Sequence, residues 1–100
     1  MSFQVKFTTE AEETYDAVIE QLHQRWGESF VIKFQNKVSK FLDKIVITPY
    51  LYPIVYENAA VRKCVLHKNC SVFYKVYDDT IDILWFWDNR QDPLIVDYHA

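Results

Sequence analysis

Residues 61–93 read VRKCVLHKNCSVFYKVYDDTIDILWFWDNRQDP, and they predict three strands joined by two tight turns. Side chains on a strand alternate between the faces of a sheet, and residues opposite each other on neighbouring strands share a face. If Asp78-Asp79 is a two-residue turn, Lys75 lies opposite Asp82, so the charges inside these strands face each other with complementary sign. The other face pairs apolar and aromatic residues: Val76 with Ile81, Tyr74 with Ile83, and Val72 with Trp85.

The connection between the first two strands predicts what occupies the face of Lys75 and Asp82. A four-residue connection from His67 to Cys70 continues the alternation into the strand that begins near Val61. The second face then carries two rows of side chains that nothing else in the sheet covers. The polar row is Arg62, Lys75 and Asp82. The apolar row is Cys64, Phe73, Leu84 and Phe86.

The first half of the chain predicts a short strand followed by two helices. Residues 2–7 alternate as a strand, and Thr9 followed by Glu12 is the signature of a capping box. Apolar residues at helical spacing continue this helix to Gly27, where a glycine is a common stop signal. A second helix is expected over Ser29 to Ile47.

The expected fold class is α+β. An N-terminal strand and an antiparallel helical hairpin pack on one face of a mainly antiparallel four-stranded sheet, and residues 50–56 form an irregular connection. Parity places Trp85 and Trp87 on the helix side of the sheet. Residues 1–100 are expected to be one domain, with a core over about 2–93 and a tail over 94–100.

The two predicted helices carry opposite charges on their outer faces. Acidic residues dominate the first helix, and lysines recur every three or four residues along the second: Lys33, Lys37, Lys40 and Lys44. These side chains are either a solvated surface with weak ion pairs or a stripe that binds an anionic partner. The whole chain has a formal net charge of −3, which is unusual for a protein that binds the ribosome.

No stretch approaches the roughly 18 to 20 apolar residues needed to span a bilayer, and no basic-then-apolar signal region begins the chain. We therefore expect a cytoplasmic protein with no membrane partner. Cys64 and Cys70 flank a turn on opposite faces and are expected to be free thiols. With His67 they offer three possible zinc ligands where a structural site needs four, so we expect no metal and no cofactor.

The order of these elements and a set of short motifs resemble the RelE/ParE superfamily of toxins from type II toxin-antitoxin modules, also described as plasmid stabilisation proteins. The resemblance covers about residues 3–93. The motifs are Glu10-Ala11-Glu12-Glu13 with Tyr15, Arg25-Trp26-Gly27, Thr48-Pro49, Arg62-Lys63, Val72-Phe73-Tyr74-Lys75-Val76, and Asn89-Arg90-Gln91-Asp92-Pro93.

The resemblance implies a bacterial toxin that a co-expressed antitoxin neutralises in a hetero-oligomer, through a disordered tail that folds on the toxin. We expect part of that contact on the bare apolar row (Cys64, Phe73, Leu84, Phe86), because exposed patches of this kind usually mark interfaces. The alternative is that residues 94–96 fold back and cover the row. Within the superfamily, ParE-like members act on DNA gyrase, and RelE-like members cut messenger RNA on the ribosome.

Metal-independent RNA cleavage needs a base, a cation that stabilises the phosphate, and a proton donor for the leaving oxygen. The resemblance places the family's basic residue at the strand start on Arg62 and its C-terminal arginine on Arg90. Two further positions at which these ribonucleases carry cations hold Cys64 and Ser71 in this chain. Lys63 is expected to point toward the helices.

Tyr98 and His99 remain candidates for proton transfer, although residues near a chain end often take no part in chemistry. Arg90 either pairs with a neighbouring aspartate or presents its guanidinium to a phosphate or an acidic antitoxin segment. The sequence favours a ParE-like toxin that acts by protein binding. The alternatives are a RelE-like ribonuclease using Arg62, Arg90, Tyr98 and His99, and an inactive member that only binds antitoxin.

Overall fold

The computed structural model describes residues 3–68 and 70–88. Within them the helices are α1 (Thr9–Trp26), α2 (Glu28–Ile45) and a single 3₁₀ turn, η1 (Glu57–Ala59). The strands are β1 (Gln4–Phe7), β2 (Ile54–Tyr56), β3 (Val61–His67), β4 (Cys70–Val76) and β5 (Thr80–Asp88). Neither α1 nor α2 is long and apolar enough to cross a membrane.

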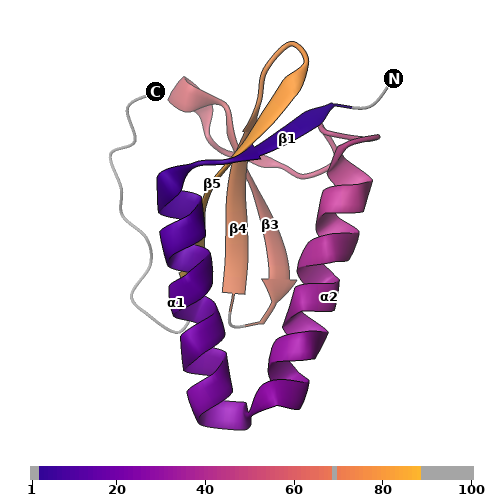
Figure 1. Ribbon diagram of the computed structural model, residues 1–100. Helices are drawn as coiled ribbons and strands as arrows, with labels where there is room; N and C mark the ends of the chain where they lie inside the picture. The colour runs from indigo at the N-terminus through magenta and orange to yellow at the C-terminus, as the bar shows by residue number, and fades with distance from the viewer. Residues whose placement is uncertain (1–2, 69, 89–100) are drawn as a thin grey trace.

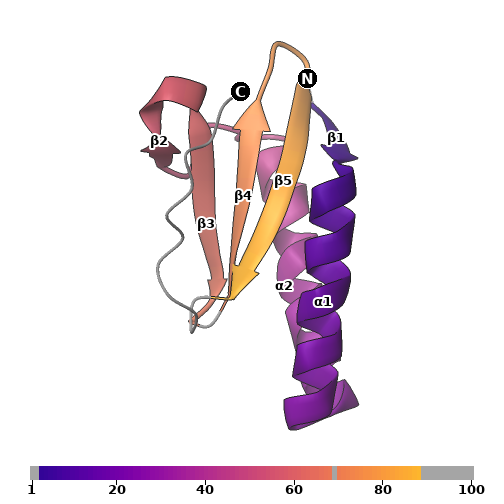
Figure 2. The same cartoon turned by 90° about the vertical axis from the view of Figure 1, so that its left-hand side faces the viewer.

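The predicted α+β fold is confirmed, with one strand more than expected. The sheet has five strands in the order β1-β5-β4-β3-β2, because the short β2 pairs with the start of β3. Only β1 runs parallel to its neighbour, β5. Both long helices lie on the same face of the sheet, and the tip of their hairpin projects beyond the strand ends (Figures 1 and 2).

The main core lies between the helices and the sheet. α1 contributes Ala11, Val18 and Leu22, and α2 contributes a stripe of buried residues at helical spacing: Val31, Phe34, Val38, Phe41 and Ile45. These side chains pack on Tyr74, Ile81 and Ile83 of the sheet, each 0 % exposed. The α2 stripe follows from the geometry of a helix, since a helix that buries one face must repeat its apolar residues every three to four positions.

The β4–β5 hairpin has the predicted register near its turn and a different one further on. Val76 pairs with Ile81, Lys75 with Asp82 and Tyr74 with Ile83, as expected. A register shift then leaves Leu84 as an extra residue, so Phe73 lies opposite Trp85, and Val72 lies opposite Phe86. A β-bulge of this kind exchanges the faces of all residues beyond it.

The bulge at Leu84 overturns the predicted faces of three residues, Phe86, Trp85 and Trp87. Phe86, expected on the open face, packs beneath the helices, 5.3 Å from the ring of Tyr15 and 6.2 Å from that of Phe7 between centroids. Trp85, expected beneath the helices, stacks instead on Phe73 at 5.0 Å. Trp87 packs beside it on the same open side.

The β3–β4 pairing is also one residue away from the prediction. His67 pairs with Cys70, and a second register shift lies between Val65 and His67. As a result Cys64 lies opposite Val72 beneath the helices, and Lys63 lies opposite Phe73. The prediction that placed Cys64 in one row with Phe73, and Arg62 in one row with Lys75, is therefore wrong.

Thr8 joins α1 to β5 and begins the helix one residue before the predicted cap. Its hydroxyl accepts the Ala11 N–H at 3.0 Å and lies 3.0 Å from the carbonyl oxygens of both Ile83 and Leu84. One turn along α1, the Thr14 hydroxyl accepts the Phe86 N–H at 2.9 Å. The two threonines thus hydrogen-bond to backbone groups of β5 at and just beyond the end of β1.

Candidate functional site

Arg62 is held by the backbone of the segment that links α2 to β2. Its Nη1 donates to the Tyr52 carbonyl at 2.6 Å and to the Tyr50 carbonyl at 3.3 Å. The guanidinium also lies over the Tyr50 ring, 5.1 Å from its centroid. Because Arg62 lies opposite Tyr74, it is on the helix side of the sheet, so it does not belong to the predicted polar row. The arrangement makes Arg62 a clamp for residues 50–52.

Tyr74 reinforces the same connection from the core. Its hydroxyl donates to the Pro49 carbonyl at 2.9 Å, and its ring packs edge to face on Phe41 and Tyr52. Burial raises the pKa of Tyr74 to about 12, although the nearby Arg62 charge acts in the opposite direction. The phenol is therefore kept neutral, as a donor of a structural hydrogen bond.

The predicted apolar row is divided between the two faces of the sheet. Cys64 and Phe86 belong to the main core under the helices, whereas Phe73 and Leu84 lie on the opposite face. Phe73 and Leu84 form a second cluster there with Ala59, Val61 and Trp85. Phe73 is only 2 % exposed and Leu84 only 6 %, so neither offers much surface to a partner.

The polar row on the open face has a different composition from the predicted one. Lys75 pairs with Asp82 as expected, and Asp82 pairs on its other side with Lys6 of β1. Lys63 is also on this face, contrary to prediction, and its Nζ lies 5.7 Å from the centroid of the Phe73 ring. The row therefore consists of Lys6, Asp82 and Lys75 across three strands.

Both cysteines are buried free thiols. Burial raises the pKa of Cys70 to about 12, and the nearby Asp88 charge acts in the same direction. Burial also raises the pKa of Cys64, against smaller opposing effects of a hydrogen bond with Tyr52 and of the Lys44 charge. The thiols are thereby kept in the protonated form, which is a poor nucleophile and a poor metal ligand.

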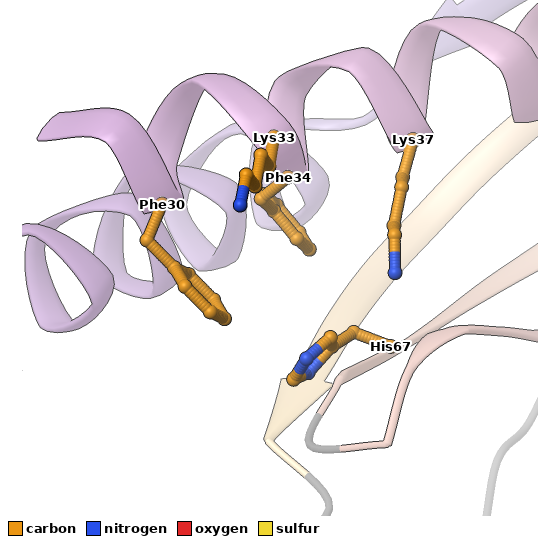
Figure 3. A pocket seen from close by; sticks show the side chains of 5 residues that line it. All are labelled: Phe30, Lys33, Phe34, Lys37 and His67. Carbon is orange, nitrogen blue, oxygen red and sulfur yellow. The ribbon is translucent and has the colours of Figure 1, made fainter. Parts of the chain in front are cut away.

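A groove runs between α2 and β3 along one edge of the molecule. At one end it forms a small pocket of about 120 Å³ lined by Phe30, Lys33, Phe34, Lys37 and His67. Figure 3 shows Phe30, Phe34 and Lys37 extending from α2 to the side on which His67 lies, with Lys33 beside Phe34. The rings of Phe30 and His67 meet edge to face at 5.3 Å.

The groove continues from Lys37 toward the other end of α2 into a wider hollow of about 350 Å³. Its lining consists of Lys37, Lys40, Phe41, Lys44, Tyr52, Cys64, Val65 and Leu66. We call the two hollows together the α2–β3 groove. The lysine row seen in the sequence is thus one wall of a groove whose floor is apolar.

Sequence reasoning found the lysine row by its helical spacing, but it missed the groove. The opposite wall comes from β3, distant in the chain, and the predicted β3 register placed Cys64 on the wrong face. Three of the predicted catalytic residues, Arg90, Tyr98 and His99, lie outside the described residues, as does the segment 94–96. Ser71 is on the open face and 0 % exposed.

The fold of the chain is similar to that of several solved structures from toxin-antitoxin systems. Over 87 % of this chain it matches 96 % of a chain of the chromosomal ParDE toxin-antitoxin system from P. aeruginosa, with a TM-score of 0.71 and 18 % sequence identity. A chain of the E. coli DinJ-YafQ toxin-antitoxin complex matches with a TM-score of 0.59 and 10 % identity, over 90 % of this chain and 96 % of that one.

The YoeB dimer from Staphylococcus aureus also matches, with a TM-score of 0.54 and 16 % identity, over 87 % of this chain and 97 % of that one. At these identities the likeness shows a shared fold. No curated protein sequence gives a significant match. The sequence itself, however, matches a described family over residues 5–93, nearly the whole chain. The chain therefore belongs to the family of ParE toxins of the type II toxin-antitoxin system parDE.

Proposed function

We propose that this ParE-family toxin inhibits growth by binding a protein target in the cytoplasm, such as DNA gyrase, and that a cognate antitoxin neutralises it in a hetero-oligomer. The observation that carries the first part is the position of Arg62. In the ribonuclease alternative, this residue supplies a cation to the phosphate. Here its guanidinium is occupied by two backbone carbonyls and an aromatic ring.

The other described positions support the same proposal. Two positions that would carry cations hold Cys64 and Ser71, both buried. Lys63 and Lys75 lie on the open face, but each ammonium lies over an aromatic ring, that of Phe73 or that of Tyr77. Acid-base catalysis requires groups whose pKa is tuned toward neutral pH. In the described part of the chain, the groups with a shifted pKa are tyrosines and cysteines. Burial raises their pKa values further above neutral pH.

The antitoxin part of the proposal draws on family membership and on the matched structures. The P. aeruginosa structure is described as a ParDE toxin-antitoxin system and the E. coli structure as a toxin-antitoxin complex. The structural matches extend to YafQ and YoeB as well as to ParE, so the fold alone does not select the target.

The proposal is tested by adding the purified chain to two assays in parallel. One measures supercoiling of relaxed plasmid by DNA gyrase, and the other measures the integrity of a reporter messenger RNA on translating ribosomes. We expect supercoiling to be inhibited while the messenger RNA stays intact. Cleavage that is lost in Tyr98→Phe or His99→Gln would establish the ribonuclease alternative, and no effect in either assay would establish the inactive one.

A further inference from the structure

The α2–β3 groove combines features that favour a polypeptide ligand. Four lysines follow one wall at positions 33, 37, 40 and 44, so their side chains lie on one face of the helix. Among the lining residues that the structure describes there is no aspartate or glutamate. The groove is therefore positively charged in a chain whose formal net charge is −3.

The floor of the groove is apolar, which distinguishes it from a simple phosphate-binding surface. Phe30, Phe34 and His67 form a pocket at one end, large enough for one aliphatic side chain. The rings of Phe30 and Trp26 stack at 4.9 Å, so one face of the Phe30 ring is already covered by a neighbour in the same part of the molecule.

Beside the wider hollow, the outer edge of β3 is not paired with any strand of residues 3–68 and 70–88. β2 pairs with β3 only at Val61 and Arg62, and the Lys63 N–H then donates to the Pro53 carbonyl at 3.1 Å. Further along β3, no strand in the described part of the chain continues this pairing. Val65 lines the groove there and is 59 % exposed. Because alternate residues direct their amides to the same edge, the Val65 backbone faces outward like that of Lys63.

We propose that the α2–β3 groove binds an acidic amphipathic segment of a partner protein. Carboxylates of the segment lie along the lysine row, and one of its apolar side chains enters the pocket of Phe30, Phe34 and His67. This inference rests on the proposed function, because the neutralising antitoxin is the protein expected to carry the segment. The groove extends along α2 from Phe30 to Lys44, about 21 Å at 1.5 Å per residue, which is the length of about 14 residues of helix.

The test uses the purified full chain and a synthetic peptide of about 14 residues, rich in glutamate with leucines on one helical face. A second peptide has the same composition with its leucines spread around the helix. Binding is followed with a fluorescent label at Val65→Cys, which is selective because Cys64 and Cys70 are buried with raised pKa.

We expect saturable binding of the amphipathic peptide, weakened by salt, and much weaker binding of its isomer. Lys37 lines both hollows, so Lys37→Glu is expected to weaken binding about tenfold or more, whereas Lys37→Arg retains it. Lys6→Glu makes the same change of net charge on β1, at the opposite edge of the sheet, and is expected to change the affinity less than about twofold. Thermal melting verifies that each variant is folded.

Three results would overturn the proposal. The first is equal loss of affinity in Lys37→Glu and Lys6→Glu, which would show that only net charge matters. The second is preferential binding of a single-stranded RNA oligonucleotide that displaces the peptide. The third is self-association of the free chain that buries the Val65 label. None of these measurements depends on growth inhibition. A wrong proposal about the groove can therefore be distinguished from a wrong proposal about the cellular target.

Discussion

Replacing Arg62 with alanine removes the clamp between β3 and the segment that follows α2. The 2.6 Å hydrogen bond to the Tyr52 carbonyl is charge-assisted and partly buried, and contributes about 1.5 kcal/mol. The longer bond to Tyr50 is exposed, and with the contact to the Tyr50 ring it adds about 1 kcal/mol. We expect Arg62→Ala to lower the free energy of unfolding by about 2.5 kcal/mol and the melting temperature by about 10 to 20 °C.

The assay is urea unfolding followed by tryptophan fluorescence. A matched control is Arg25→Ala, since Arg25 also lies over an aromatic ring, 5.9 Å from the Trp26 centroid, but on the exposed end of α1. That control is expected to lose less than about 0.5 kcal/mol. If Arg62→Ala unfolds at the same urea concentration as the wild type, Arg62 does not clamp residues 50–52. Its guanidinium would then be available to stabilise a phosphate, as the ribonuclease alternative requires.

Other substitutions test the faces, the helix start and the buried thiol. Phe86→Ala removes a ring from the main core and is expected to cost about 3 to 5 kcal/mol in urea unfolding; a loss below about 1 kcal/mol would place Phe86 on the open face, as the simple alternation predicted. Thr8→Val is expected to cost about 2 kcal/mol, whereas Thr8→Ser, which keeps the hydroxyl, is expected to be close to wild type; equal losses in both would deny the hydroxyl its capping role. Because burial raises the pKa of Cys70 from 9.0 to about 12, the native state holds the thiol proton more tightly than the unfolded state. Its contribution to stability is therefore complete below about pH 9 and is lost as the pH rises toward about 12, by up to about 4 kcal/mol. Cys70→Ala is expected to show a shallower fall of stability across this range, and parallel curves for the two proteins would contradict the assignment.

The sequence predicted the helical hairpin, the β4–β5 turn and the class of fold, because each depends on local periodicity. The α2 stripe is regular, and Lys75 opposite Asp82 fixes the register next to the turn. Beyond that point polar and apolar residues no longer alternate, since Leu84, Trp85, Phe86 and Trp87 are all apolar. Shifting such a run by one residue leaves both faces hydrophobic, so nothing in the pattern indicates a bulge.

The candidate site was predicted only in part, because local periodicity reveals one face of a helix but not the register of the strand that packs beside it. The lysines of α2 could be recognised by their spacing, but the pocket they border needs His67 and Leu66 from β3, whose register includes a second irregularity. The short β2 lies just after Pro53 and has only three residues, which is too few for a periodic signal. Arg62 was expected on the open face, and only the tertiary contact with Tyr50 and Tyr52 reveals its structural role.

We infer that this toxin acts by binding a protein and not by cutting RNA. The direct measurement is to induce the chain in growing cells and to determine, at the onset of growth arrest, both the topology of a reporter plasmid and the 5′ ends of cellular transcripts. We predict a change in plasmid topology with transcripts intact. New transcript 5′ ends that appear before any change in topology, and that disappear in Tyr98→Phe or in a folded Arg62→Lys variant, would contradict it.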